Sequence, residues 1–345
     1  METEKKKGMS STGKWALVFL FEILIAVGLG LGYFHYWLNH KLDKVHVVSI
    51  NRENLAINEG GNAAQQDFTN IAIFGIDSRD TDSMLEGNRC DSIVIASINN
   101  STKEVKFVSV YRDTLFHVDA AGGLATKLTY AYAYGGPELA IATLNHNLDL
   151  QITDFVTVNY LALSKAIDEI GGLNINVRPE ELHILNICIT EQINITGVYS
   201  DGVFNAGEQN LNGTQATAWT RIRDTDQGDI TRTERQREVI AKMFEKLKAS
   251  DAATINHILD EVFPSISTSM EKEAMLELLK DASKYNLTEE VGFPFDYEMV
   301  SDEKRGSVLI PKDLTENVSK LHQTMFGTAA YQPSGEVKKI SDELK

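Results

Sequence analysis

One long apolar run near the N-terminus limits what this chain can fold into more than any other feature. Residues 15–38 hold almost only apolar and aromatic side chains, and about 20 such residues are enough for a helix to cross a bilayer. Aromatic rings stand at both ends of the run, and four lysines precede it. Aromatic rings favour the membrane interface, and lysines favour its cytoplasmic side. The sequence therefore predicts a cytoplasmic tail over residues 1–14 and a single transmembrane helix over residues 15–38.

Two other interpretations of the run are weaker. A cleaved signal peptide has a shorter apolar core followed by a small-residue cleavage site, whereas bulky residues follow this run. A buried helix of a soluble domain is disfavoured by the length of the run and by its flanking lysines. Glu22 lies within the run, where it is either neutral or faces a partner helix, because a carboxylate in lipid is costly. We therefore expect a single-pass cell-membrane protein with its C-terminal part outside the cell.

The rest of the chain is predicted to form a polar stalk, one large domain and a polar tail. We expect the stalk over residues 39–68, the extracellular domain over residues 69–327 and a frayed tail over residues 328–345. Apolar periodicity predicts strands over residues 70–76, 91–98, 105–110, 155–158 and 173–177. It predicts helices over residues 130–148, 161–170, 212–219, 231–247, 254–262, 272–285 and 314–325. Strands that alternate with helices predict an α/β fold in which helices flank a mixed central sheet.

Charge and composition exclude some classes of site. The formal net charge is -16, whereas general nucleic-acid binding requires a basic face, so no nucleic-acid partner is expected. Cys90 and Cys188 lack the spacing of zinc ligands; they either pair as an extracellular disulfide or remain free thiols. The histidines form no cluster with ligand spacing, and His117, His146 and His183 are expected to serve packing or the surface.

Arginines are concentrated where lysines are missing. The chain has 11 arginines, and residues 210–241 contain five of them and no lysine. A guanidinium group offers a planar, two-pronged donor that matches phosphate oxygens. For any single arginine, a structural salt bridge is the better explanation. Five arginines in one short window without lysine instead favour an anion-binding site. The arginines of the two dense windows are Arg79, Arg89, Arg112, Arg221, Arg223, Arg232, Arg235 and Arg237.

The second window contains further local patterns. Residues 231–234 have the spacing of a capping box and predict a helix N-terminus, where backbone N–H groups bind anions. Arg232, Arg235 and Gln236 would share one face of that helix. Arg221 and Arg223 would share a face of an extended stretch.

Aspartates cluster at the ends of the predicted strands. Asp77 ends the first strand, Asp91 starts the second, and Asp113 follows the third, while Asp229 precedes the predicted helix. Strand ends at one rim of an α/β sheet are common ligand sites. Mg²⁺ prefers one or two carboxylates together with substrate phosphates. Asp77 and Asp91 are therefore either a magnesium site or ordinary turn residues.

Seven segments resemble, in order and spacing, the LytR-CpsA-Psr family. The resemblance covers residues 70–248 and includes FGIDSRD, RCDSIVIASIN, VSVYRDT, KLTYAYAYGG, AIDEIGGLNINV, LNGTQATAWTRIR and GDITRTERQREVI. It implies an α-β-α sandwich with a long apolar pocket for a prenyl chain. It also implies a phosphotransferase that moves a glycopolymer, such as teichoic acid or capsule, from a polyprenyl-pyrophosphate carrier to peptidoglycan.

The resemblance further implies roles for individual residues. Asp77 and Asp91 would hold Mg²⁺, or Mn²⁺ in its place. The pyrophosphate contacts would come from Arg89, Arg112, Arg221, Arg223, Arg232 and Gln236. The catalytic set would be Asp77, Asp91, Arg112, Arg223 and Asp229. Asp229 would act as a general base or orient an arginine, Lys127 matches a lysine of the family, and Cys90 stands where serine is common.

The sequence leaves several alternatives open. Asp77, Asp80, Asp113 and Asp229 are all candidates for a general base. Residues 140–148 and 161–167 would either line a lipid slot or pack in the core. With water as the acceptor, the same site would make the protein a hydrolase of polyprenyl-pyrophosphate lipids. A second alternative to the phosphotransferase is a non-catalytic lipid-binding scaffold or regulator of envelope assembly.

Overall fold

The computed structural model describes residues 36–344, except for residues 59–62, 78–84, 86, 120–121 and 224–227. The chain forms two compact units, Met1–Lys44 and Val45–Lys345. In the first unit, the described residues 36–42 are helical. Most of the predicted transmembrane segment, residues 15–38, lies outside the described residues. No helix within the described part of the chain has the length and apolar character needed to span a membrane.

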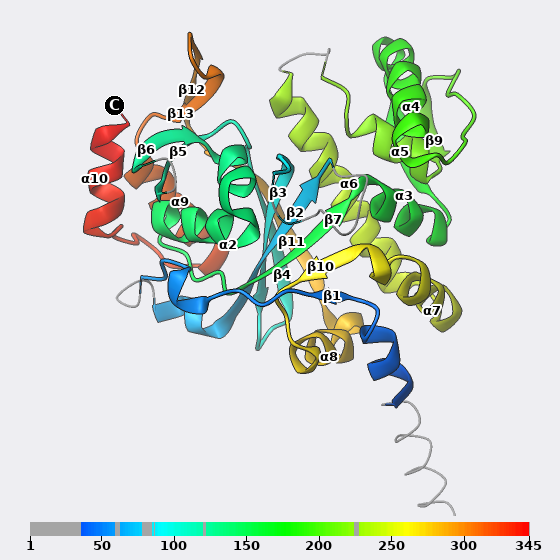
Figure 1. Ribbon diagram of the computed structural model, residues 1–345, viewed down its shortest axis with the longest axis horizontal. Helices are drawn as coiled ribbons and strands as arrows, with labels where there is room; N and C mark the ends of the chain where they lie inside the picture. Colours follow the sequence, from blue (N-terminus) through cyan, green and yellow to red (C-terminus); the bar gives the residue numbers. More distant parts are fainter. Residues whose placement is uncertain are drawn as a thin grey trace, which may run out of the picture. The chain divides into compact units, whose positions relative to one another are not determined.

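A mixed seven-stranded sheet forms the centre of the second unit (Figure 1). Its strand order is β1-β10-β7-β2-β3-β4-β11. The strands β2, β3 and β4 are antiparallel neighbours, whereas β7 runs parallel to β2 and β11 runs parallel to β4. The sheet thus confirms the predicted fold class. The strands are β1 His46–Val47, β2 Phe68–Ile76, β3 Cys90–Asn99, β4 Glu104–Val110, β7 Asp154–Asn159, β10 Ile266–Thr268 and β11 Asn286–Phe293.

Three helices and a densely packed apolar core cover one face of the sheet. They are α2 (Leu128–Leu148), α9 (Leu314–Phe326) and α10 (Gly335–Glu343), and side chains such as Phe74 and Ile95 pack beneath them. The backbone of α2 is non-helical at Gly135 and Gly136. Pro137 therefore begins a new helical segment, where its missing N–H costs nothing, as predicted.

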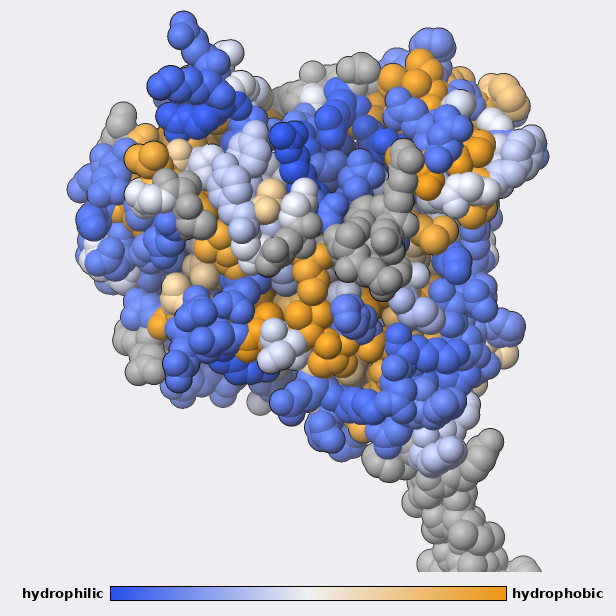
Figure 2. All heavy atoms as spheres, viewed as in Figure 1, coloured by the Kyte–Doolittle hydropathy of each residue, from blue (hydrophilic) through white to orange (hydrophobic). Residues whose placement is uncertain are grey.

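The opposite face carries a second helical layer with its own apolar cluster (Figure 1). Residues such as Ile167, Trp219 and Val239 form this cluster. In the view of Figure 2, hydrophobic residues gather near the middle of the molecule and hydrophilic residues surround them. The helices of this layer are α3 Tyr160–Glu169, α4 Leu182–Thr196, α5 Gly213–Trp219, α6 Asp229–Ala249 and α7 Ala252–Glu261.

Smaller elements complete the fold. Three two-stranded antiparallel sheets stand beside the main sheet. They pair β5 (Leu115–Val118) with β6 (Leu124–Lys127), β8 (Leu173–Val177) with β9 (Gly207–Leu211), and β12 (Tyr297–Asp302) with β13 (Gly306–Pro311). The helix α8 spans Lys272–Lys280, shorter than the predicted helix over residues 272–285.

The predicted stalk and tail are wrong for residues 45–68 and 328–344, because most of both segments packs into the folded unit. Strand β1 pairs with β10, and Leu55 is fully buried. Helix α10 buries Val337 and Ile340. Apolar residues three and four positions apart are enough to dock one face of a helix, so the polar composition of α10 concealed its packing.

Candidate active site

A largely apolar cavity lies between the sheet and the helices α3, α6 and α7. Its volume is about 350 Å³. Residues 161–167 contribute Ala162, Leu163 and Ala166 to its wall, whereas apolar residues of 140–148 pack in the core on the other face. Of the two predicted lipid-slot segments, residues 161–167 therefore line this cavity, and residues 140–148 do not. Polar side chains border the cavity as well, and they are Asp91, Ser92, Asn159, Tyr160, Thr220 and Gln236.

An irregularity between β2 and β3 positions Asp91 at the polar side of this cavity. Gly75 pairs with Ser92, and Ile76 pairs with Cys90, so Asp91 is the extra residue of a β-bulge. A Cβ atom on Gly75 would lie 2.9 Å from the Cβ of Ser92. The close approach of the two strands at the bulge therefore requires glycine.

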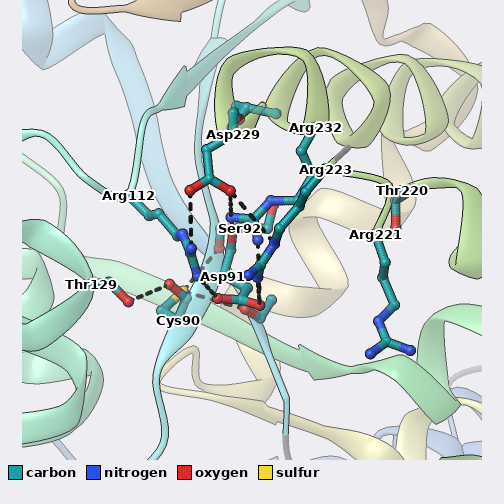
Figure 3. Close-up of polar contacts among 12 residues, drawn as sticks. Cys90, Asp91, Ser92, Arg112, Thr129, Thr220, Arg221, Arg223, Asp229 and Arg232 are labelled. Atoms are coloured by element: carbon teal, nitrogen blue, oxygen red, sulfur yellow. Dashed lines mark hydrogen bonds and ion pairs between the residues drawn. The ribbon is translucent and has the colours of Figure 1, made fainter. Parts of the chain in front are cut away.

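Three arginines from different segments converge on Asp91 and Asp229 (Figure 3). Arg112, which follows β4, bonds to Asp91, and its Nη2 lies 3.1 Å from Asp229 Oδ2. Arg223 Nη2 and Arg232 Nη1 lie 3.5 and 3.7 Å from Asp91 Oδ2. The same two arginines approach Asp229 Oδ1 to 3.6 and 3.4 Å. Three guanidinium groups thus share these two carboxylates. Asp113 Oδ2 also lies 3.9 Å from Arg112 Nε, and Lys127 pairs with Asp113, so the cations of the cluster outnumber its carboxylates.

The electrostatic surroundings keep Asp229 ionised. Burial alone would raise the pKa of Asp229, but Arg232 and Arg112, together with the adjoining Asp113, lower it to about 2. Burial would also lower the pKa of Arg112, yet the carboxylates of Asp91, Asp229 and Asp113 raise it. Burial lowers the pKa of Arg232, whose side chain is 1% exposed.

Asp113 and Lys127 extend this cluster. Lys127 Nζ lies 3.1 Å from Asp113 Oδ1, and burial together with the adjoining Asp229 raises the pKa of Asp113. From the sequence, Asp113 was only one of four candidate bases, and Lys127 was only a match to a lysine of the family. Thr129 N donates to Arg112 O, so the first turn of α2 is tied directly to the end of β4. No local sequence pattern predicts the contact between Thr129 and Arg112.

Other predicted site residues lie beside the cluster without joining its ion pairs. Arg221 points away from Asp91 in Figure 3 and pairs with Glu191 at 3.3 Å. Its guanidinium also lies 5.2 Å from the ring centroid of Tyr160, whose hydroxyl is 3.4 Å from Asp91 Oδ2. Arg89 stacks over the ring of Tyr130 at 5.4 Å.

Asp77 and Gln236 border the same region. Asp77 directly follows β2 and is exposed. Its charge contributes to the raised pKa of Tyr160, which burial raises most. Gln236 lines the cavity from α6. Asp80 and Arg79 lie outside the described residues.

Three local predictions in the second arginine window are wrong. The helix α6 begins at Asp229 with Gly228 as its N-cap, so residues 231–234 are already inside the helix and cannot form its capping box. Arg221 and Arg223 do not share a face, because the stretch between them is not extended. Arg235, predicted to lie with Arg232, instead binds the buried Glu181 at 2.8 Å and is a structural ion pair.

Several buried polar atoms of the site have no hydrogen-bond partner within the described part of the chain. They include Asn159 Nδ2, Arg232 Nε and Gln236 Oε1. An unpaired buried polar atom costs free energy, so nearly all such atoms in proteins have partners. The two donors among them, Asn159 Nδ2 and Arg232 Nε, are suited to the oxygens of an anionic ligand.

The carboxylates fit a hard divalent ion. The last residue of β2, Ile76, pairs with the first residue of the antiparallel β3, Cys90, so Asp77 and Asp91 lie at the same end of the sheet. Both offer oxygen ligands, which Mg²⁺ prefers. Arginines already surround Asp91, and their positive charge opposes a further cation. A phosphate group would balance that charge and so favour binding of the ion.

The two cysteines are free and buried, so the free-thiol alternative is confirmed and a disulfide is excluded. Burial raises the pKa of the Cys90 thiol. Cys90 therefore acts as a small core residue beside Asp91.

Comparison with known proteins identifies the family. The family model described as LytR_cpsA_psr matches residues 38–302. This chain belongs to the LytR-CpsA-Psr family. The motif order over residues 70–248 predicted this membership, and the match extends it at both ends.

Named relatives in the family span most of this chain. The polyisoprenyl-teichoic acid–peptidoglycan teichoic acid transferase TagU of Enterococcus faecalis is 29% identical over 278 residues, covering 79% of this chain and 84% of that protein. A solved structure from Streptococcus agalactiae has a TM-score of 0.65 at 24% identity and covers 79% of this chain and 93% of its own. The structure of the family protein TagT with bound octaprenyl pyrophosphate lipid has a TM-score of 0.58 at 20% identity. The match covers 81% of this chain and 100% of the TagT chain. At these identities the structural likeness establishes the fold alone.

Proposed function

We propose that this protein is a phosphotransferase that moves a glycopolymer from a polyprenyl-pyrophosphate carrier to peptidoglycan. The observation that carries the proposal is the excess of guanidinium groups around Asp91 and Asp229, beside a cavity with an apolar wall. A pyrophosphate lipid has the matching chemistry, with an anionic head and a long hydrocarbon tail. The names of the relatives point to the same class of donor and acceptor.

In the proposed reaction, a hydroxyl oxygen of peptidoglycan forms a bond to the phosphorus nearer the glycan. The bond from that phosphorus to the bridging oxygen breaks, and polyprenyl phosphate leaves. Arg112, Arg223 and Arg232 stabilise the charge on the phosphate oxygens and on the leaving group, where the transition state requires it. Arg89, Arg221 and Gln236 are proposed to bind the outer part of the head group.

The proton of the acceptor hydroxyl requires a base. Asp229, with its pKa near 2, is a poor proton acceptor and is better suited to orient Arg112 and Arg232. Asp77 and Asp113 are the remaining candidates within the described residues, and Asp113 has the raised pKa that favours proton uptake.

Magnesium is proposed as the cofactor, with Mn²⁺ as a substitute. Asp77 and Asp91 would hold the ion, which, when bound, would add charge neutralisation at the pyrophosphate. The protein is proposed to sit in the cell membrane through residues 15–38, with its N-terminus cytoplasmic and its site extracellular, close to a membrane-held donor.

The proposal is tested with the purified full chain, a synthetic prenyl-pyrophosphate glycan and peptidoglycan fragments, and the products are read by mass spectrometry. We expect glycan phosphate joined to peptidoglycan, with loss of product in the presence of chelator. Arg223→Gln should lower the rate by about 10²-fold or more, because a charge-stabilising donor is removed.

Arg52→Gln is the matched control. Arg52 is 53% exposed and pairs with the single carboxylate of Asp154, whereas Arg223 is 50% exposed and faces two. An equal loss of transfer rate in both variants would contradict the site assignment. Release of prenyl phosphate without glycan transfer would identify a hydrolase, and lipid binding with no product would identify a scaffold.

A further inference from the structure

A second cluster of ligand-type side chains lies outside the proposed phosphotransferase site. His117, Asp119 and His146 each place one ligand atom within 4.8 Å of the others. His117 lies in β5, Asp119 follows that strand, and His146 lies in the last turn of α2. No local sequence pattern predicts this grouping, since 29 positions separate the two histidines.

The backbone holds the two histidines in place. Asn147, the residue after His146, is fully buried. Its Oδ1 accepts from His117 N, and its Nδ2 donates to His117 O, both at 2.9 Å. This two-way amide contact locks β5 to the end of α2. The rings of His117 and His146 therefore stand together, with centroids 5.8 Å apart.

Helix α10 adds a carboxylate near each imidazole. Glu343 Oε2 lies 4.0 Å from His117 Nε2, and Glu336 Oε2 lies 4.0 Å from His146 Nε2. Arg305 borders the same hollow, but Asp302 and the carbonyl of Ala125 engage its guanidinium. The cluster therefore presents two imidazoles and three carboxylates.

One atom of the cluster lacks a partner. His117 Nδ1 is buried and has no hydrogen bond to any described residue, and the nearest carboxylate oxygen, from Asp119, is 3.8 Å away. That separation is too long for a hydrogen bond. An ion between them would satisfy both groups.

We propose that His117, Asp119 and His146 bind a first-row divalent transition metal of the Zn²⁺ class. Glu343, which faces the other ring nitrogen of His117, would be an outer hydrogen-bond partner, and Glu336 a further ligand or a second such partner. Imidazole with carboxylate selects such ions, whereas Mg²⁺ and Ca²⁺ prefer oxygen alone. Tetrahedral zinc with bonds of about 2 Å sets its ligands roughly 3.3 Å apart. The side chains must close by about 1 Å or more, which the exposed Asp119 allows. The bound ion would fasten α10 to β5 and α2.

The experiment titrates Zn²⁺ into the metal-stripped full chain in the presence of excess Mg²⁺, with a coloured chelator as competitor. We expect one tightly bound Zn²⁺ per chain, a higher Tm, slower hydrogen exchange in α10, and the visible spectrum of tetrahedral coordination when Co²⁺ replaces Zn²⁺. His117→Gln and His146→Gln should each weaken binding by about tenfold or more.

His257→Gln is the matched control, because His257 faces only one carboxylate, Glu169, at 3.9 Å. Its zinc affinity should equal that of the wild type. Asp91→Asn distinguishes the two sites: loss of Zn²⁺ in this variant but not in the histidine variants would overturn the proposal. The absence of stoichiometric binding to a folded wild-type chain, judged by its Tm without metal, would also overturn it.

Discussion

Arg232 is the largest of the fully buried side chains in the described part of the molecule, and the stability of the site depends on its partners. A buried charge is tolerated only when opposite charges and hydrogen bonds compensate for its lost hydration. Asp91 and Asp229 supply that compensation, but they also serve Arg112 and Arg223. The free site is therefore incompletely neutralised, and an anionic ligand should stabilise the fold as it binds.

Asp229→Asn tests the electrostatic account of the cluster. An acid whose pKa is lower in the folded state stabilises the fold above its unfolded pKa, and this contribution disappears as pH falls through the folded value. For Asp229 the ordinary value is 3.8 and the folded value is about 2. The difference in unfolding free energy between wild type and variant should therefore be full above about pH 4 and shrink towards pH 2.

Urea unfolding at several pH values measures this difference. Asp281→Asn gives a useful comparison, because Lys103 and Lys284 also hold the pKa of Asp281 near 2, but Lys284 is 63% exposed, whereas Arg232 beside Asp229 is 1% exposed. Its effect should be smaller, since solvent screens exposed ion pairs. A pH-independent difference for Asp229→Asn would contradict the assigned ion pairs.

At the scale of single residues, the sequence predicted which charged residues lie together, but not every contact among them. Asp91, Arg112, Arg223, Asp229 and Arg232 converge because strand ends and one helix start meet at the same rim. The pairing of Lys127 with Asp113 and the grouping of the histidines arise from contacts between β4, β5 and α2, which no local pattern encodes.

Among the elements, β2 and β3 make the tight contact that lies beside the site. The bulge at Asp91 depends on the contact between Gly75 and Ser92. Gly75→Ala would push these strands apart and displace Asp91 from the arginines. We expect a loss of about 1–3 kcal/mol in unfolding free energy, together with a fall in phosphotransferase activity.

The double variant with Ser92→Gly provides the control. Removing the Cβ of residue 92 makes room for the new methyl group, so the strands should close again and part of the lost stability should return. If Gly75→Ala alone leaves both stability and activity unchanged, the tight strand contact does not position Asp91.

The elements were predicted well where periodicity was strong and less well at their ends. The predicted strands and hairpin over residues 70–110 agree with β2, β3 and β4. The start of α6 was misplaced because Gly228, with φ of 62°, caps the helix without a side chain. Asp229 then occupies the first turn, where a carboxylate suits the helix dipole.

Across the whole molecule, the two faces of the sheet differ in packing. One face is filled by α2, α9 and α10, while the other leaves a cavity beneath α3 and α6. Ala162→Phe should fill part of this cavity. We expect weaker binding of a long-chain prenyl pyrophosphate, by about tenfold or more, because one phenyl group displaces several methylene groups worth about 0.8 kcal/mol each.

A short-chain prenyl pyrophosphate serves as the internal control for that variant. It presents the same head group and needs little of the cavity, so its affinity should change little. Fluorescence competition can measure both ligands on the same preparation. Equal weakening for both chain lengths would show that the cavity does not hold the tail.

Helix α10 belongs to the main core despite its polar composition. Ile340 is 2% exposed and packs in the same cluster as the central strands. Ile340→Ala should lower the unfolding free energy by about 2–5 kcal/mol, whereas Lys338→Ala, at an exposed position of the same helix, should change it little. Urea unfolding of both variants measures the contrast, and equal small effects would mean that α10 is dispensable.

The layered α/β architecture was predictable from alternating strand and helix patterns, but the limits of the domain were not. Several partners of the described residues between 45 and 68 lie more than 80 positions away, as the contact of Leu55 with Asn145 illustrates. Composition alone makes such a segment look like a linker. Its burial becomes evident only when its distant partners are known.

The position of α10 has a consequence for how the protein is made. A ribosome adds about 5–20 residues each second, so the β2–β4 sheet segment is complete long before α10 exists. Until then the apolar faces of α2 and α9 that α10 will cover remain open. Native packing can finish only at the end of synthesis, and the nascent chain needs protection from aggregation until that moment.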